Sequence, residues 1–109
     1  MAMAAPDLAT AATGWVEQEV EVPNPQGVHA RPAMMIAKTA SGFKAEVAIR
    51  RNESDVNAKS PIQLLTLVAE QGARLRVRAC GDDAQEAVEA LVSLVRRGFD
   101  EMGPAADVP

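Results

Sequence analysis

Three short segments of this chain alternate apolar and charged residues, and this alternation restricts the fold more than any other feature. In the segment 74–79, three arginines alternate with aliphatic residues. The segments 16–22 and 44–50 alternate in a similar way. A period of two is typical of a strand that has one buried face. We therefore expect a sheet that helices cover on one side only.

Two helices are predicted between these strands. The segment 32–40 is rich in Ala, Met and Ile and is followed by Gly42, which is typical of a helix that ends at a glycine. Ser60 and Pro61 suit the N-cap and the first helical position of a second, short helix that runs to about residue 68.

A third helix is predicted near the C-terminal end of the patterned region. It begins at Asp82 or Asp83, and Glu86 is expected to complete a capping box with Asp83. Its apolar residues recur at helical spacing. The dipeptide 52–53 favours a turn between the strands 44–50 and 54–57. The resulting order of elements is β-α-β-β-α-β-α.

Two of the predicted strands carry opposite charges on their outward faces. The first strand has glutamates at positions 17, 19 and 21, and the fourth has arginines at positions 74, 76 and 78. If these strands are antiparallel neighbours, the glutamates face the arginines, and this pairing helps to set the register. We expect all three arginines to point outward. Arg50, Arg51 and Lys59 are likewise expected to be solvated.

Composition excludes several classes of function. The 109 residues are enough for one domain, which we place at 15–102 between flexible tails at 1–14 and 103–109. A net charge of −4 and the scarcity of aromatic residues argue against nucleic-acid binding. No apolar run approaches the ~18 residues of a membrane span. The single cysteine, Cys80, favours a reducing compartment, so we expect a cytoplasmic protein.

His29 is the only histidine, and it lies in a loop that leads into the first helix. One histidine cannot form a multi-histidine metal site, and we expect neither a metal nor a cofactor. The backbone N–H groups of Ala30 and Arg31 are candidates for the first-turn donors that lack an intrahelical acceptor. An imidazole, a guanidinium and a positive helix end therefore converge, which favours an anion such as phosphate. Either His29 or Arg31 is the N-cap, because Pro32 restricts the residue before it.

The same environment suits His29 to carry a phosphoryl group. Positive potential disfavours the imidazolium form, so we expect the ring to be neutral near pH 7 and able to act as a nucleophile. Once the ring is phosphorylated, Arg31 and the helix end offset the negative charge. The neighbouring sequence offers no carboxylate that would direct a water molecule, which argues against a small histidine-dependent hydrolase.

The segment 27–33, Gly-Val-His-Ala-Arg-Pro-Ala, resembles the active-site segment of HPr, the histidine phosphocarrier of the bacterial phosphoenolpyruvate-dependent phosphotransferase system. The family usually has Leu where Val28 stands. The resemblance extends from about residue 16 to residue 97 and includes Asn57-Ala-Lys-Ser60 and the segment 81–83, Gly-Asp-Asp. It implies an α+β fold, an open-faced β-sandwich in which a four-stranded antiparallel sheet has three helices on one face.

The resemblance also implies a function. His29 would be phosphorylated on Nδ1 by enzyme I and would pass the group to an EIIA-type acceptor in sugar phosphotransfer, while Arg31 positions the phosphoryl group. Such a phosphocarrier is a substrate of other enzymes and not itself an enzyme, and we expect a monomer. The alternative is a regulatory protein of a nitrogen-related phosphotransfer branch, which senses its phosphorylation state and binds partners rather than feeding transport.

Ser60 occupies the position where a regulatory kinase phosphorylates many members of the family. An HPr serine kinase/phosphatase is therefore a further expected partner. Pro61 departs from the aliphatic residue that the family usually has, which removes apolar contact from that surface. The N-cap role of Ser60 is expected in either case.

The second helix has more apolar residues than one face of a short helix can bury. We expect Ile62 and Leu65 to stay exposed near His29 and to form a small docking patch with Met34 or Met35. A small patch suits a carrier that must release its partner.

Overall fold

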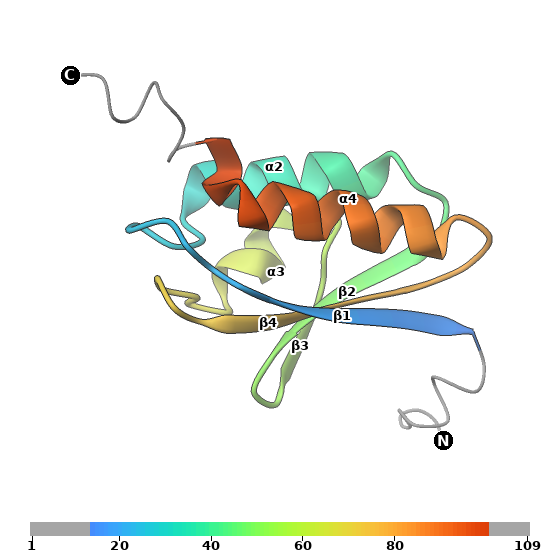
Figure 1. Ribbon diagram of the computed structural model, residues 1–109, viewed down its shortest axis with the longest axis horizontal. Coiled ribbons are helices and arrows are strands. Elements are labelled where there is room, and N and C mark those ends of the chain that lie inside the picture. Colours follow the sequence, from blue (N-terminus) through green and yellow to red (C-terminus); the bar gives the residue numbers. More distant parts are fainter. Residues whose placement is uncertain (1–13, 101–109) are drawn as a thin grey trace.

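The computed structural model of the protein describes residues 14–100, which form the predicted order β-α-β-β-α-β-α (Figure 1). The strands are β1 (Trp15–Glu21), β2 (Glu46–Arg51), β3 (Ser54–Asn57) and β4 (Arg74–Cys80). The helices are α2 (Ala30–Ser41), α3 (Pro61–Leu65) and α4 (Ala84–Arg96), and a 3-10 turn, η1 (Gly98–Asp100), follows. Apart from Gly14, the expected tails lie outside the described residues.

The four strands form one antiparallel sheet in the order β1-β4-β2-β3. Helices α2 and α4 lie side by side across one face of this sheet (Figure 1). Helix α4 packs on β1, β4 and β2, and the short α3 contacts α2 and β3. The other face of the sheet carries no helix of the described chain. The predicted fold class is therefore confirmed.

The core fills the space between the sheet and the helices and consists almost entirely of aliphatic side chains. The strands contribute Val20, Ile49, Leu75 and Val77, and the helices contribute Ile36, Leu64, Val88 and Leu91, all buried. Phe99 in η1 is fully buried as well, which places the largest core side chain after the last helix. Because each strand buries alternate residues, its charged residues point to the open face.

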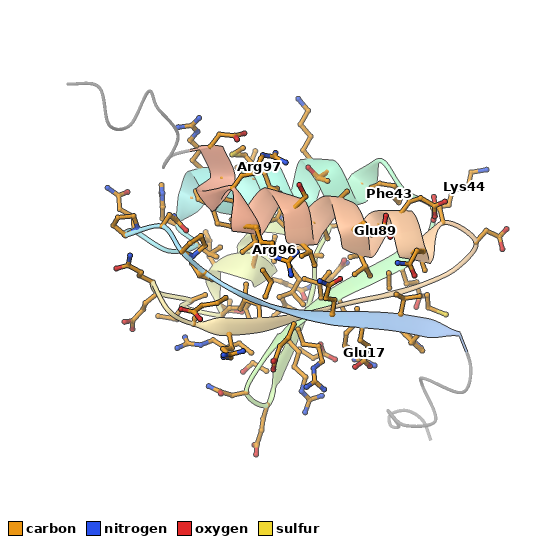
Figure 2. All side chains as sticks on the ribbon, in the orientation of Figure 1. Glu17, Phe43, Lys44, Glu89, Arg96 and Arg97 are labelled. Carbon is orange, nitrogen blue, oxygen red and sulfur yellow. The ribbon has the colours of Figure 1, made fainter. Side chains whose placement is uncertain are left out.

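The predicted register between β1 and β4 is confirmed: Glu17 faces Arg78, Glu19 faces Arg76 and Glu21 faces Arg74. The glutamates point away from the helices, as Glu17 does in Figure 2. Cross-strand ion pairs accompany this register, including diagonal pairs of Arg76 with Glu17 at 3.7 Å and of Arg74 with Glu19 at 3.3 Å. Opposite charges therefore mark the strand neighbours on the open face.

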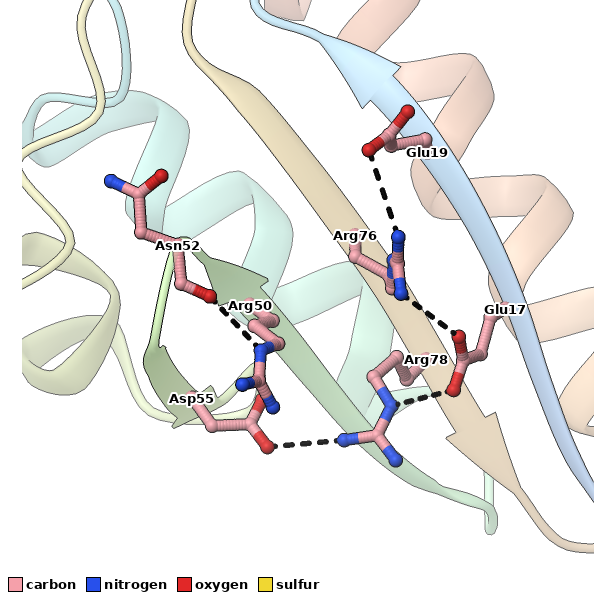
Figure 3. Close-up of polar contacts among 7 residues, drawn as sticks. All are labelled: Glu17, Glu19, Arg50, Asn52, Asp55, Arg76 and Arg78. Atoms are coloured by element: carbon pink, nitrogen blue, oxygen red, sulfur yellow. Dashed lines mark hydrogen bonds and ion pairs between the residues drawn. The ribbon is translucent and has the colours of Figure 1, made fainter. Parts of the chain in front are cut away.

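Arg78 points to the open face as predicted, but the expectation that it is exposed there is wrong, because this residue is only 8% exposed. Its Nε donates to Glu17 at 3.0 Å and its Nη1 donates to Asp55 at 3.1 Å (Figure 3). Its guanidinium also lies 4.8 Å from the centre of the Trp15 ring. β4 lies between β1 and β2, so neighbours on both sides cover Arg78.

Three further residues that we expected to be solvated are partly exposed, and each also donates to backbone carbonyls. Arg51 Nη1 donates to the carbonyl oxygens of Leu67, at 3.1 Å, and of Val68. Lys59 Nζ donates to a carbonyl oxygen in the loop before β2 at 2.8 Å, and Arg50 Nε donates to the turn between β2 and β3 at 3.0 Å. Loop carbonyls need donors from outside the sheet, and these side chains provide them.

The helix ends show two departures from the predictions. Helix α2 begins two residues earlier than predicted, and Gly42 has φ −76°, a right-handed conformation that does not require glycine. Helix α3 ends at Leu65, before residue 68, and Val68 has a positive φ of 49°.

Asp83 is the N-cap of α4, but the predicted capping box with Glu86 does not form. The Asp83 carboxylate instead accepts from the backbone N–H groups of Lys44, at 2.9 Å, and Ala45, at 2.8 Å. The bond from Lys44 is the main cause that lowers the pKa of Asp83 below its ordinary value of 3.8. This carboxylate therefore joins the start of α4 to the start of β2.

Candidate functional site

His29 is the N-cap of α2, which decides between the two residues proposed for that position. Its backbone is extended, with φ −100° and ψ −163°, and its side chain is half-buried. The first i to i−4 bond of the helix runs from the N–H of Ala33 to the carbonyl oxygen of His29, at 3.0 Å. The N–H groups of Ala30 and Arg31 therefore precede the hydrogen-bonded ladder, at the positive end of α2.

The loop before His29 is attached to the loop that follows α3. The N–H of Val28 donates to the carbonyl oxygen of Ala69 at 2.8 Å. Gly27 has φ +65°, and a Cβ atom there would lie 2.2 Å from that same oxygen and 2.8 Å from Cα of Glu70. Only glycine tolerates both the left-handed conformation and this close approach. The buried Asn24 donates from Nδ2 to the carbonyl oxygen of Gly27 at 2.8 Å, which closes the loop.

The electrostatics at the start of α2 favour an anion. The first turn contains no acidic residue, and Arg31 lies exposed in it, two positions after His29. Pro32 is buried in the same turn. A helix N-terminus with a guanidinium beside it attracts phosphate, and a carboxylate in this turn would oppose that attraction.

Ser60 is the N-cap of α3, as predicted, and Pro61 occupies the first helical position. The Oγ of Ser60 accepts from the N–H of Gln63 at 3.3 Å. Ser60 is half-buried. Helix α3 contacts α2, so Ser60 and His29 begin neighbouring helices.

Four large apolar side chains are exposed on the neighbouring helices α2 and α3 and just after α3. They are Met34, 60% exposed, Ile62, 73%, Leu65, 39%, and Val68, 65%. Met35 is half-buried and packs against the core, so Met34 is the methionine that is exposed. Val68 was not predicted, because residue 68 was placed within the helix. It directly precedes Ala69, whose carbonyl oxygen holds the His29 loop. We call these four residues the apolar patch.

Residues 14–100 contain neither a membrane-spanning helix nor a cluster of metal ligands. No helix in this range is long and apolar enough to cross a membrane. The same residues contain no group of three or more His, Cys, Asp or Glu side chains placed to hold a metal ion.

Comparison with known proteins identifies the family. Residues 16–97 match the family described as the PTS HPr component phosphorylation site. The chain is 42% identical over 87 residues to phosphocarrier protein NPr of Escherichia coli, covering 79% of this chain and 97% of that protein. It is 38% identical over 86 residues to phosphocarrier protein HPr of Neisseria meningitidis, with the same coverage of 79% and 97%.

Solved structures show the same fold. An HPr structure from Thermoanaerobacter tengcongensis matches with a TM-score of 0.77 and 38% identity, over 81% of this chain and 99% of that one. An HPr structure from Bacillus anthracis matches with a TM-score of 0.72 and 34% identity, over 74% and 96%. Proteins of this family are phosphocarriers that interact with enzyme I and EIIA-type proteins and are not themselves enzymes. The family match, the relatives and the fold agree, and the chain belongs to the HPr family of phosphocarrier proteins.

Proposed function

We propose that His29 accepts a phosphoryl group from enzyme I and passes it to an EIIA-type acceptor. The observation that carries this proposal is the place of the half-buried His29 as N-cap of α2, beside first-turn N–H groups that precede the helical ladder. The lone pair of Nδ1 attacks the phosphorus of phosphorylated enzyme I. The P–N bond to His29 forms while the bond to the donor breaks, and the bonding electron pair remains on the donor.

Arg31 and the backbone N–H groups of Ala30 and Arg31 stabilise the transferred group. The phosphoryl oxygens carry the negative charge that a helix N-terminus and a guanidinium favour. These donors are part of the fold before the group arrives, so little reorganisation is needed during transfer. The same positive groups stabilise the phosphoryl group when it arrives from enzyme I and when it leaves for the EIIA-type acceptor. This suits a carrier more than a phosphatase.

The apolar patch is the proposed docking surface for both partners. Its most exposed members are Ile62, Val68 and Met34. A patch of four apolar side chains next to the phosphorylation site gives a small interface, and small interfaces release their partners quickly. We propose that residues 15–102 form this carrier domain and act as a monomer.

Ser60 is a second proposed phosphorylation site, the target of an HPr serine kinase/phosphatase. Its hydroxyl caps α3, and Ile62 of the apolar patch lies two residues further along the same helix. A phosphoryl group on Ser60 adds about two negative charges next to this patch. Docking of enzyme I would then weaken, because burying an apolar surface next to these charges is unfavourable.

Two downstream roles are consistent with this phosphoryl transfer. In sugar phosphotransfer the phosphoryl group continues to a permease, whereas a regulatory protein of a nitrogen-related branch acts through binding in one phosphorylation state. Relatives named NPr and relatives named HPr resemble this chain to a similar degree, 42% and 38% identity. That similarity supports both roles.

The test is to incubate the protein with enzyme I and radiolabelled phosphoenolpyruvate. The proposal predicts an acid-labile, base-stable label that is discharged when an EIIA-type protein is added. His29→Ala should not be labelled, and Arg31→Gln should be labelled more slowly. The carrier function would be contradicted if the label remained on the protein after EIIA-type proteins from the sugar branch and from the nitrogen-related branch had both been added.

A further inference from the structure

A second charged site, whose lining does not include His29, is a groove with a volume of about 560 Å³. The turn between β2 and β3 lines one part of it, and the start of β4 lines another. The charged residues that line the groove are Glu19, Arg50, Arg51, Arg74 and Arg76. Asn52, Gly72 and Ala73 complete the lining.

The charge of this groove is opposite to that of the whole chain. The chain has a net charge of −4, yet four of its eight arginines and a single carboxylate line this one groove. Concentration of one sign of charge in a concave surface raises the local concentration of ligands of opposite charge. The positive charge is therefore local to this groove and cannot be inferred from the net charge of the chain.

Two of the arginines already converge on one anionic group of the protein. The Glu19 carboxylate lies 3.3 Å from Arg74 and 3.8 Å from Arg76, and Figure 3 shows the contact with Arg76. The side chains of both arginines are exposed to about half or more, at 66% and 50%. Both guanidinium groups therefore bind the Glu19 carboxylate and remain accessible to a further anion.

Backbone carbonyls hold the other two arginines in place. Arg51 uses Nη1 for its bonds to Leu67 and Val68, and Arg50 uses Nε for its bond to Asn52. A guanidinium carries five N–H donors, so these bonds position each side chain and leave donors on the remaining nitrogens for a ligand. Positioning in advance lowers the entropy that binding must overcome.

We propose that this groove binds a compact polyanion that carries two or more phosphoryl groups. The groove is lined by two arginines of β2 and two of β4, which is more than one phosphate can contact, and paired guanidinium–phosphate contacts are strong. The volume lies within the range of roughly 300–1,000 Å³ that small-molecule sites have. The proposal does not depend on the function proposed for His29.

The test is a titration of the ¹⁵N-labelled protein with inorganic pyrophosphate at physiological ionic strength, followed by two-dimensional NMR. We expect saturable shifts of the backbone amides at 50–52 and 72–76. The double variant Arg50→Gln/Arg74→Gln should weaken binding about tenfold or more, the size expected from losing charged hydrogen bonds. Arg96→Gln/Arg97→Gln, which removes two exposed arginines at the end of α4 and directly after it, is the control matched in charge and should bind as the parent does.

His29→Ala should also bind pyrophosphate as the parent does, which separates this site from the phosphorylation site. Loss of binding in His29→Ala would overturn the proposal, because the anion would then occupy the start of α2. Equal losses in Arg96→Gln/Arg97→Gln and in Arg50→Gln/Arg74→Gln would show unspecific charge attraction. Orthophosphate that binds as tightly as pyrophosphate would contradict the ligand class. Affinity that keeps growing with polyphosphate chains longer than tripolyphosphate would contradict a compact groove.

Discussion

The N–H of Val28 donates to the carbonyl oxygen of Ala69 across 2.8 Å, and this bond attaches the loop before α2 to the loop after α3. We call this contact between the two loops the joint. His29 directly follows Val28 on one side of it, and Val68 of the apolar patch directly precedes Ala69 on the other. The proposed phosphorylation site and the proposed docking surface thus share one backbone contact. The joint exists because Gly27 leaves room for the Ala69 carbonyl group.

Gly27→Ala should therefore destabilise the protein and slow phosphorylation. The added Cβ would lie 2.2 Å from the Ala69 oxygen, and we expect the free energy of unfolding in urea to fall by about 3 kcal/mol. Gly72→Ala is the control: φ there is +90°, but a Cβ meets no atom of the described chain within 4 Å. Its loss should be about 1 kcal/mol, from backbone strain alone. Equal losses in the two variants would show that the joint is not tightly packed.

Val68→Gly should stabilise the protein. A branched side chain at φ +49° is strained, and this conformation costs roughly 1–2 kcal/mol that glycine does not incur. Because glycine also gains entropy in the unfolded chain, we expect the free energy of unfolding to rise by about 0.5–1 kcal/mol. Val68→Ala keeps the strain and removes the same exposed side chain. A glycine variant no more stable than the alanine variant would argue against strain at this position.

Arg78→Gln should cost about 2–3 kcal/mol of unfolding free energy. The variant leaves the carboxylates of Glu17 and Asp55 without their shared cation and removes the contact with Trp15. Arg74→Gln, on the same strand and exposed, should cost about 0.5 kcal/mol or less. Thermal or urea unfolding of both variants measures the difference. Similar costs would mean that Arg78 contributes no more than a surface charge.

Asp83→Asn should weaken the dependence of stability on acid pH. The N–H of Lys44, and then that of Ala45, lower the pKa of this carboxyl in the folded protein below 3.8. The charged carboxylate therefore stabilises the fold at pH values above 3.8, and this contribution is lost as pH falls through the lower folded pKa. Urea unfolding at a series of pH values should show a shallower acid limb for Asp83→Asn. Asp82→Asn, the neighbouring carboxylate, is the control, and an acid limb changed equally by both variants would contradict the assignment.

Ser60→Asp should slow phosphoryl transfer from enzyme I while the stability stays close to that of the parent. Aspartate is also a favourable N-cap, so α3 keeps its cap, but a negative charge is added next to Ile62. Ser60→Asn preserves a capping side chain without the charge and should transfer at the parent rate. Transfer by Ser60→Asp at an unchanged rate would count against a regulatory role of this serine.

Local patterns predicted the elements and the neighbours of β1 well. Alternating valines and glutamates define the buried face of β1, and the arginines at the matching positions of β4 specify its partner. The N-cap role of Ser60 follows from two adjacent residues. In each case the determining information lies within a few residues or in a repeated charge pattern, which sequence reasoning can detect.

Contacts between distant segments were not predictable in this way. The bond from Arg78 to Glu17 spans 61 residues, and the bond from Ala45 to Asp83 spans 38. Whether an outward arginine is buried depends on which strand is central, and the β-α-β-β-α-β-α order alone leaves that open. The apolar patch was partly predicted, but Val68 depends on where α3 ends. His29 was identified from its motif, whereas its N-cap geometry required the structure.

The most direct test of the account is to locate the phosphoryl group on the protein after reaction with enzyme I and phosphoenolpyruvate. Protein labelled with ¹⁵N in its histidine is suited to this, because NMR then distinguishes the two ring nitrogens of His29. The account predicts a ¹⁵N–³¹P coupling at Nδ1 and no phosphoryl incorporation in His29→Ala. A phosphoryl group on Nε2, or incorporation in His29→Ala at the parent level, would contradict it.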